Sequence, residues 1–327
     1  MTAPAPSPTQ SAVTEASNRF VAEHLEQAVT LGARLAELVS EPDAFVKATR
    51  FGFTAMADPA YIDGVRTVTP GLGSVLGVRL PLLEAAHKQF RAATKQTAAP
   101  LILDVTDRLL LDEAADIRWF GMWNLERLLR KDPERTWQLM RCAAREAGEW
   151  ISVDTLAHPY GAGILQEPRR WVELEQLVFS PSRWERRLVG STLATLPHVR
   201  LAGARDPAVV AHGLALIGQL IGDHEPDVQK ALSWALRTMA ELDSETVVAF
   251  LETETATARD TDDGSRAWVI RDSLSKIHVE TAERLRARLE GVRRRPGAPS
   301  TSRAAAAAAQ FASTGAAQRP VNSPLEG

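Results

Sequence analysis

The sequence contains almost no cysteine: Cys142 is the only one among 327 residues. A lone cysteine excludes a disulfide within the chain and is typical of a reducing compartment, where such a thiol is usually a small buried apolar group. No apolar run reaches the roughly 20 residues that a membrane span requires, and Met1 to Thr9 lacks the pattern of a signal peptide. We therefore expect a cytoplasmic protein without membrane contact.

Motifs for metals and nucleotide cofactors are also missing. The seven histidines are scattered, with no CxxC, HxxH or HExxH spacing, so we expect no metal site. Neither GxGxxG nor GxxxxGK followed by Ser or Thr occurs, and Gly71-Leu72-Gly73 is typical of a loop. We expect no cofactor. The formal net charge of -3 argues mildly against nucleic acid, so any contact with phosphates requires local Arg and Lys.

What the chain does contain is a monotonous helical pattern after Pro100. Breaks occur at 131–133, 148, 167–168, 180–181, 206–207 and 225–226. No period-two stretch rich in Val, Ile and Thr occurs, so we predict an all-α protein without sheet. Segments from near Ser182, Asp227 and Ser265 share an opening of Arg or Lys, Trp and then Leu about every 40 residues, which is typical of HEAT-like repeats. Such repeats stack into a right-handed-type α-solenoid with a concave binding face.

The two ends of the chain differ from this repeat region. Residues 1–12 are rich in Pro, Ser, Thr and Ala and are predicted to be disordered. Residues 296–327, which include the run from Ala304 to Ala309, are predicted to be a low-complexity tail that follows a last helix ending in Arg293 to Pro296. The region between the two tails, residues 13–295, is the predicted helical domain.

The first part of this domain is less regular. Apolar residues recur at helical spacing from Ala12 to Lys47, which predicts one long or two short helices. The stretch from Phe51 to Gly73 holds most of the Gly and Pro residues of positions 13–94 and is predicted to be a loop. Pro81 suits the first turn of a further helix, which we expect to run to about Thr94.

The segment from Asp227 to Leu242 turns a large residue away from its apolar face. That face consists of Val228, Ala231, Leu232, Ala235, Leu236, Met239 and Leu242. At about 100 degrees per residue, Trp234 falls on the opposite side, together with Lys230, Arg237 and Glu241. An exposed indole between cations indicates a binding surface.

The segment from Ser182 to Leu196 has a similar division. Its apolar stripe consists of Leu188, Val189, Leu193 and Leu196, and its other side carries Arg183, Arg187, Gly190, Ser191 and Ala194. Two arginines followed by small residues would let a polyanion backbone approach closely and place guanidinium groups on phosphates. A solvated charged face explains the same pattern, and both interpretations stay open. Arg186, nearer the apolar edge, is predicted to pair with a carboxylate.

An aromatic residue and a carboxylate share one helical face in the stretch from Glu149 to Asp154. Trp150 and Asp154 are four residues apart, so on a helix they lie one above the other. An aromatic plane beside a carboxylate can stabilise a cation from two sides. The alternative is an ordinary helix start with a buried tryptophan and an exposed aspartate. Core positions are what we expect for the other early tryptophans, Trp119, Trp123 and Trp137.

Together these pieces resemble the AlkD-type alkylpurine DNA glycosylases, proteins with HEAT-like repeats that remove alkylated bases. The matching stretches are Trp150 to Asp154, Trp184 to Arg187 and Gln229 to Arg237, with weaker ones at Leu76 to Pro81 and Ser265 to Ile277. They occur in the family's order over roughly residues 45 to 280. The resemblance implies that the concave face of the solenoid binds DNA.

The resemblance also implies roles for individual residues. Trp150 and Trp234 would hold the damaged nucleotide, and Asp154 would be the catalytic carboxylate. Arg187 would grip the DNA backbone, with Arg237 as a further phosphate contact. The other implied DNA-binding residues are Arg183, Lys230 and Arg79. The implied partner is double-stranded DNA that contains alkylated purines, bound by a monomer associated with the nucleoid.

The chain departs from the family pattern at two places. Pro226-Asp227 stands where family members carry an aromatic pair, and Arg79 stands where a Gln can stand. These departures bear on the range of substrates rather than on catalysis.

The main hypothesis is a monofunctional DNA glycosylase for cationic N3- or N7-alkylated purines, tolerant of bulky adducts and independent of metal or cofactor. Such a leaving group needs little general-acid help, and an ionised Asp154 would stabilise the oxocarbenium-like sugar. Two alternatives stay open. One is a non-catalytic HEAT-repeat protein that binds distorted or branched DNA, and the other is a scaffold for protein interactions.

Overall fold

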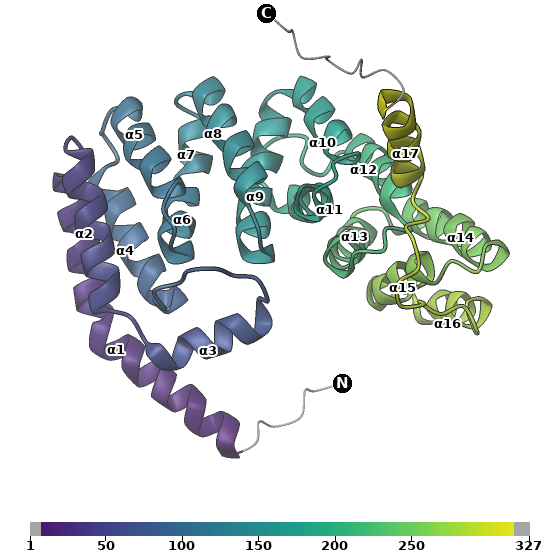
Figure 1. The fold of residues 1–327 in the computed structure, drawn as a ribbon, viewed down its shortest axis with the longest axis horizontal. Coiled ribbons are helices and arrows are strands. Elements are labelled where there is room, and N and C mark those ends of the chain that lie inside the picture. Colours follow the sequence, from purple (N-terminus) through teal and green to yellow (C-terminus); the bar gives the residue numbers. More distant parts are fainter. Residues whose placement is uncertain (1–7, 317–327) are drawn as a thin grey trace, which may run out of the picture. The chain divides into compact units, whose positions relative to one another are not determined.

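The computed structural model describes residues 8–316 (Figure 1) and confirms the all-α prediction. In this range it contains no named strand, only the isolated bridges Ala57–Val78 and Ser74–Ala114. The helical architecture is consistent with an α-solenoid. No helix of the described range is long and apolar enough to cross a membrane. The chain divides into two compact units, unit 1 (residues 1–155) and unit 2 (residues 156–327).

Unit 1 extends from α1 to the first turns of α9. Its helices are α1 (Pro8–Glu37), α2 (Pro42–Ala55), α3 (Pro59–Val68), α4 (Leu80–Ala93), α5 (Ala99–Leu110), α6 (Ala115–Met122), α7 (Leu125–Leu129), α8 (Pro133–Glu146) and α9 (Trp150–Gln166). α1 packs against α2 and α4, and α5 packs against α2 and α6. In the core between them, Phe45 meets Phe90 and Phe53 meets Phe120 in edge-on ring contacts.

Unit 2 contains the helices that follow. They are α10 (Trp171–Leu177), α11 (Arg183–Thr195), α12 (Pro207–Leu220), α13 (Pro226–Ala240), α14 (Ser244–Asp260), α15 (Gly264–Ser273), α16 (Val279–Arg288) and α17 (Arg303–Ala316), with short 3-10 helices at Pro168–Arg170, Leu196–His198 and Leu274–Lys276. α11 packs along α13, and α13 packs on α15. The predicted apolar stripes of α11 and α13 are buried, except that Leu242 is only half-buried.

Proline and aspartate explain where many helices begin. α8, α12 and α13 each start at a proline, whose missing N–H costs nothing at the first helical position. Aspartates then cap the free N–H groups: the side chain of Asp206 accepts a hydrogen bond from the N–H of Ala208 (2.8 Å), and Asp243 accepts one from Thr246 (3.0 Å). The predicted chain breaks lie at or just before such helix starts.

Two predictions for unit 1 were wrong. The supposed loop from 51 to 73 contains the end of α2 and all of α3, because Pro59 begins α3 and Asp58 caps it through the N–H of Ala60 (3.0 Å). Cys142 is exposed rather than buried. At the N-terminus, α1 already begins at Pro8, so residues 8–12 belong to a helix; the rest of that predicted tail lies outside the described residues.

The C-terminal segment is more ordered than the prediction. Its alanine run forms α17, which packs on α12, and Ala304 is 2% exposed. Before it, the N–H of Thr301 donates to the carbonyl of Gly222 (3.0 Å). Alanine has the highest intrinsic helix propensity, so this run predicts a helix as readily as a low-complexity tail. The predicted last helix is also shorter, since α16 ends at Arg288. Residues 317–327 lie outside the described range.

Candidate functional site

A buried carboxylate holds the first turn of α9. Glu149 is 2% exposed and accepts hydrogen bonds from the N–H groups of Ile151 (2.5 Å) and Ser152 (2.9 Å). It also accepts from the hydroxyl of Ser152 and from the indole Nε1 of Trp119 (3.3 Å). Free N–H groups at the helix start are thereby satisfied. Sequence reasoning gave Glu149 no such role, although a Glu directly before a helical segment is a usable signal.

Trp150 is the first residue of α9 and is half-buried. Its indole Nε1 donates a hydrogen bond to the carbonyl of Val68 (3.1 Å), at the last residue of α3. The bond joins residues 82 positions apart in the chain. Trp150 is therefore held at its backbone by the capped helix start and at its ring by α3.

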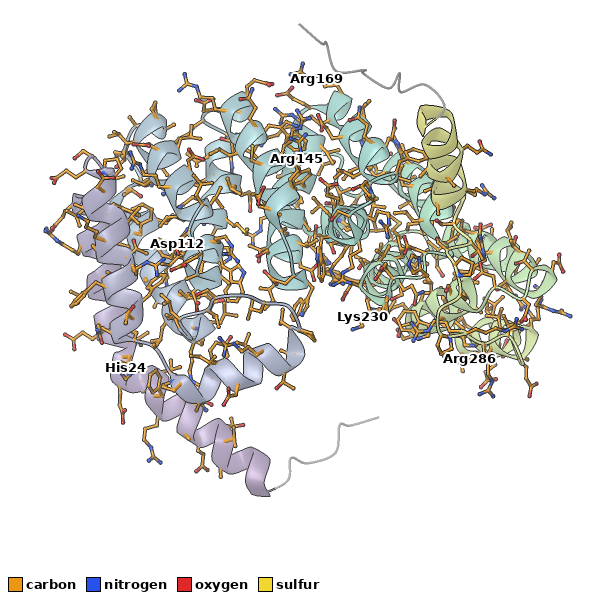
Figure 2. The ribbon with its side chains drawn as sticks, viewed as in Figure 1. His24, Asp112, Arg145, Arg169, Lys230 and Arg286 are labelled. Carbon is orange, nitrogen blue, oxygen red and sulfur yellow. The ribbon has the colours of Figure 1, made fainter. Side chains whose placement is uncertain are left out.

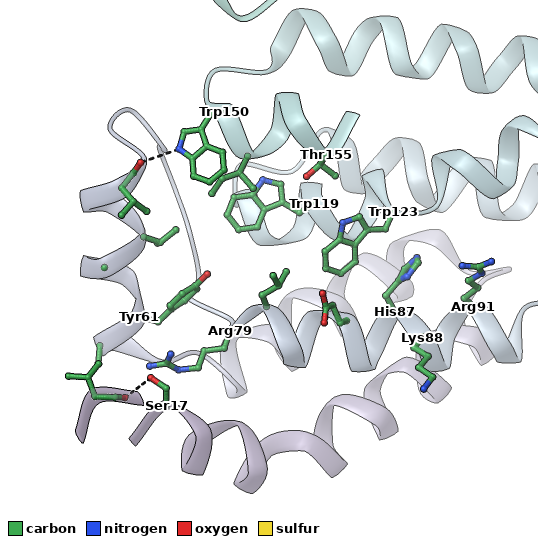
Figure 3. A pocket seen from close by; sticks show the side chains of 18 residues that line it. Ser17, Tyr61, Arg79, His87, Lys88, Arg91, Trp119, Trp123, Trp150 and Thr155 are labelled. Carbon is green, nitrogen blue, oxygen red and sulfur yellow. Dashed lines mark hydrogen bonds between the residues drawn. The ribbon is translucent and has the colours of Figure 1, made fainter. Parts of the chain in front are cut away.

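The indole of Trp150 forms part of the wall of a pocket of about 870 Å³ in unit 1 (Figure 3). Its aromatic lining consists of Tyr61, Trp119, Trp123 and Trp150. In Figure 3 the three indoles stand along one side of the pocket, and Tyr61 with Arg79 lies across from them. Trp119 and Trp137 are buried as predicted, at 4% and 5% exposure, but Trp123 is half-buried and faces the pocket.

Asp154 lies one helical turn after Trp150 on α9, as the sequence predicts, and is half-buried. The residues of α9 that line the pocket are Trp150, Ile151 and Thr155, so Asp154 is not part of that lining. Residues i and i+4 of a helix share a face. The structure thus places the predicted carboxylate next to the aromatic wall but outside the pocket itself.

Arg79 borders the same pocket, with its guanidinium already engaged. Its Nε and Nη2 each lie 2.6 Å from Oδ2 of Asp58, and the guanidinium carbon lies 5.3 Å from the centroid of the Tyr61 ring. The segment that precedes Arg79 is held by Asp116, which accepts from the N–H groups of Leu76 (2.7 Å) and Val78 (3.0 Å). Burial raises the pKa of the Asp116 carboxyl. Arg79 would have to share its charge between Asp58 and any phosphate.

In unit 2, the face of α11 that was expected to meet a polyanion is covered by α13. A methyl group added to Gly190 would lie 2.8 Å from the Cβ of Ala231, and Ser191 and Ala194 are fully buried. The small residues therefore serve close helix packing, and their interpretation as a surface for a nucleic-acid backbone was wrong. Arg187 is likewise buried, at 6% exposure, and its Nη1 donates to the carbonyl of Asp227 (2.7 Å).

The cations around this packed pair are largely matched by carboxylates. Arg186 pairs with Asp223 (2.7 Å), which confirms the predicted partner type. Arg183 lies 3.5 Å from a carboxylate oxygen of Glu225, and its guanidinium lies 4.7 Å from the centroid of the Trp184 ring. Carboxylates therefore partly neutralise the positive charge near the starts of α11 and α13.

On α13, the predicted binding face is only partly open. Trp234 is half-buried rather than exposed, whereas Lys230 is exposed (Figure 2). Arg237 pairs with Asp272 (2.6 Å), and its Nη1 also lies 3.4 Å from the hydroxyl of Ser233. Two predicted phosphate contacts lie on this helix. Lys230 has an exposed side chain, whereas Arg237 is held in an ion pair with Asp272 of α15.

The predicted site residues thus fall into two groups. Trp150, Asp154 and Arg79 belong to unit 1, and the remaining residues are Arg183, Arg187, Lys230, Trp234 and Arg237 of unit 2. In unit 1, Trp150 and Arg79 line the same pocket, and in unit 2 the other residues lie on the packed helices α11 and α13. Their use as one site stays a prediction. Among the described residues, no cluster of three His, Cys, Asp or Glu side chains is arranged to hold a metal ion.

Comparison with known protein families places the chain among DNA repair proteins. A family model with the description "DNA alkylation repair enzyme" matches residues 50–277, which is more than half of the chain and includes the predicted site residues. No curated protein sequence matches the chain. The matched range begins after α1, so the part of α1 that lines the pocket, at Val13 and Ser17, lies outside it.

Proposed function

We propose a DNA glycosylase activity for this chain, which belongs to the DNA alkylation repair enzyme family. The proposed reaction is hydrolysis of the N-glycosidic bond of cationic N3- or N7-alkylated purines in duplex DNA, with tolerance for bulky adducts. The observation that carries the proposal is the start of α9, where a half-buried carboxylate, Asp154, lies one turn from an indole, Trp150, that is hydrogen-bonded in place.

The chemistry follows from the leaving group. When the bond between C1′ and the base nitrogen breaks, its electron pair leaves with the purine and neutralises the positive charge of the base. The sugar becomes oxocarbenium-like, and an ionised Asp154 beside C1′ would stabilise that cation. Water then bonds to C1′ and loses its proton to Asp154 or to solvent. Electron-rich indole faces, such as that of Trp150, would favour the cationic nucleotide.

Unit 2 would supply the second indole, Trp234, and the contacts to the DNA backbone. Arg187, Arg237, Arg183 and Lys230 are the proposed phosphate contacts, with Arg79 as a contact from unit 1. In this proposal the helices form a right-handed-type solenoid of HEAT-like repeats, and its concave face binds the duplex as a monomer. Guanidinium groups suit this task because their fixed donors match two phosphate oxygens.

The test is a direct assay of base release. Duplexes with a single 7-methylguanine, a 3-methyladenine analogue or a bulky N7 adduct are incubated with the protein and then treated with alkali. Strand cleavage at the lesion, with the intact base recovered by mass spectrometry, is the expected result. Tight binding without release of any of these bases would contradict the proposal and favour a non-catalytic protein that binds distorted DNA.

A further inference from the structure

One end of the unit 1 pocket carries positive charge without a matching carboxylate. Lys88 and Arg91 of α4 line this end, both side chains are exposed, and neither forms an ion pair within the described part of the chain. Glu84 lines the pocket one turn earlier on the same helix. Other exposed cations of unit 1 are mixed: Arg34 and Arg108 have carboxylate partners, whereas Lys47 and Arg66 form no ion pair among the described residues.

Two buried side chains near the pocket residue His87, Asn124 and Arg127, carry donors without acceptors although neither lines the pocket. Arg127 is otherwise engaged: its Nη1 donates to Oγ1 of Thr94 (2.9 Å), and its guanidinium carbon lies 5.2 Å from the centroid of the Phe90 ring. Nε2 of His87 lies 3.3 Å from Oδ1 of Asn124. Nδ2 of Asn124 and both Nε and Nη2 of Arg127 are buried and have no hydrogen-bond partner among the described residues. Such groups are rare in proteins, because an unpaired buried donor is costly.

The pKa values of two of these groups also indicate an excess of positive charge. Burial, together with the charges of Arg127 and Arg91, lowers the pKa of His87 to about 4. Burial and the charge of Arg91 lower the pKa of Arg127 to about 10. Even with His87 neutral, the region has a surplus of cations and donors, so an anionic ligand complements it better than a neutral one.

The adjoining wall suits a planar ring. Trp123 is half-buried, its ring meets the His87 ring edge-on at 5.5 Å, and its Nε1 has no hydrogen-bond partner among residues 8–316. In Figure 3 Trp123 lies beside His87, with Arg91 beyond His87 and Trp119 on the other side of Trp123. A volume of about 870 Å³ is in the range of small-molecule sites. Aromatic planes beside cations are the combination that proteins use for unpaired nucleotides.

We propose that this pocket binds a nucleotide, with its base stacked on Trp123 and its phosphate on Lys88 and Arg91. Glu84 would accept hydrogen bonds from amino or imino groups of the base, as carboxylates do with base edges, which favours guanine. A neutral aromatic group would leave the exposed cations Lys88 and Arg91 unmatched. The nucleotide is either a free mononucleotide or an unpaired nucleotide of DNA. The inference does not depend on base excision, and binding is measurable in a protein that excises nothing.

The first experiment is isothermal titration calorimetry of the full chain with dGMP, deoxyguanosine and inorganic phosphate. We expect dGMP to bind, and Arg91→Ala to weaken it about tenfold by removing one charge-assisted contact. Deoxyguanosine should bind more weakly and be insensitive to Arg91→Ala. The control is Arg66→Ala, which removes an exposed arginine of α3 that does not line the pocket.

Trp123 provides a second, independent variant. Trp123→Ala should weaken dGMP and deoxyguanosine alike, by about tenfold or more, whereas Trp123→Phe should retain part of the affinity because a ring remains. Thermal unfolding of each variant checks that the fold is intact. An Arg91→Ala protein that binds dGMP as tightly as the wild type would overturn the assignment of the phosphate.

A third experiment distinguishes the two sources of the nucleotide. A duplex with one unpaired 2-aminopurine should lose fluorescence on binding, with the loss abolished by Trp123→Ala, if the ligand is a nucleotide of DNA. Binding of dGMP without this quenching assigns the site to a free nucleotide. Absence of both signals in the wild type overturns the proposal. Loss of excision confined to bulky adducts in Trp123→Ala, again without nucleotide binding, would assign the pocket to the adduct.

Discussion

The pocket end of unit 1 and the α11–α13 face of unit 2 both carry arginine and lysine, but they differ in whether these cations have carboxylate partners. In unit 1, Lys88 and Arg91 have no carboxylate partner in the described residues, and three buried donor nitrogens of the nearby Asn124 and Arg127 have no acceptor there. On the α11–α13 face of unit 2 three arginines are paired, Arg183 with Glu225, Arg186 with Asp223 and Arg237 with Asp272. Lys230 is the exception, because it is exposed and forms no ion pair among the described residues. Counts of arginine and lysine therefore do not indicate where an anion is attracted.

The difference matters for binding to a polyanion. A phosphate that approaches Arg237 must displace a carboxylate, whereas one that approaches Arg91 meets an unmatched charge. Partly exposed ion pairs contribute only about 0–1 kcal/mol each, so such an exchange is possible but gains little. We expect unit 2 to bind DNA with modest affinity per cation and with strong dependence on salt.

The largest expected effect is on the rate of excision, and it should come from the carboxylate of Asp154 rather than from the cations of either unit. Asp154→Asn removes the charge that would stabilise the oxocarbenium-like sugar, so single-turnover excision should slow by roughly two to three powers of ten. DNA affinity should stay unchanged or rise, since a negative charge near phosphate is lost. Excision at the wild-type rate would remove Asp154 from the chemistry.

The next effect concerns packing. Gly190→Ala places a methyl group 2.8 Å from the Cβ of Ala231 and 2.9 Å from its carbonyl carbon, so we expect the free energy of unfolding to fall by about 1–3 kcal/mol. The matched control in unit 1 is Gly64→Ala within α3, where no atom lies within 4 Å and a gain of about 0.5–1 kcal/mol is expected. Urea unfolding of both variants would measure the contrast, and equal changes would contradict it.

A pH dependence should arise from unit 1. The pKa of His87 is about 4 in the folded chain and 6.5 as the ordinary value, so between these values the unfolded chain binds more protons. Stability then falls as the pH falls below 6.5, by at most about 1.4 kcal/mol per pH unit from this group. His87→Gln should flatten that part of the profile of unfolding free energy. An unchanged profile would show that His87 titrates normally.

Arg187 tests the paired face of unit 2. Arg187→Ala should weaken DNA binding and lower the slope of log affinity against log salt by about one unit, as expected for one phosphate contact. Because Arg187 also donates to the carbonyl of Asp227, the variant must first be shown to fold. Arg259→Ala, on α14, serves as the control for a general loss of charge. Identical slopes for the three proteins would leave Arg187 with a purely structural role.

The smallest effect comes from releasing a paired cation. Asp272→Ala leaves Arg237 without its carboxylate partner, so DNA affinity at low salt should rise by up to about fivefold, the equivalent of an exposed ion pair. The gain should vanish in Asp272→Ala combined with Arg237→Ala. Salt-titrated fluorescence anisotropy with an undamaged duplex is the measurement, and a loss of affinity would show that the pair positions Arg237 rather than neutralising it.

Several features could be predicted from the sequence because they depend on neighbours along the chain. The absence of sheet, the helix starts at Pro133, Pro207 and Pro226, and the apolar stripe of α13 follow from local spacing. α3 is harder to predict, because the Gly and Pro residues around it favour a loop while Asp58-Pro59 is a usual helix start. The alanine run has the composition of a low-complexity tail, yet alanine also has the highest helix propensity, and the run forms part of α17.

By itself, the sequence determined most helices of the repeat region, the apolar faces of α11 and α13, and the position of Asp154 one turn from Trp150, since a helix repeats about every 3.6 residues. Only the tertiary structure decided which surfaces remain open. Gly190 and Arg187 became buried because α13 lies against α11, some 40 residues later in the chain. Trp123 became a pocket wall because α3, α4 and α9 meet around it. The spacing of residues along the chain predicts which side chains share a helix face. Whether that face is exposed depends on contacts between residues far apart in the chain.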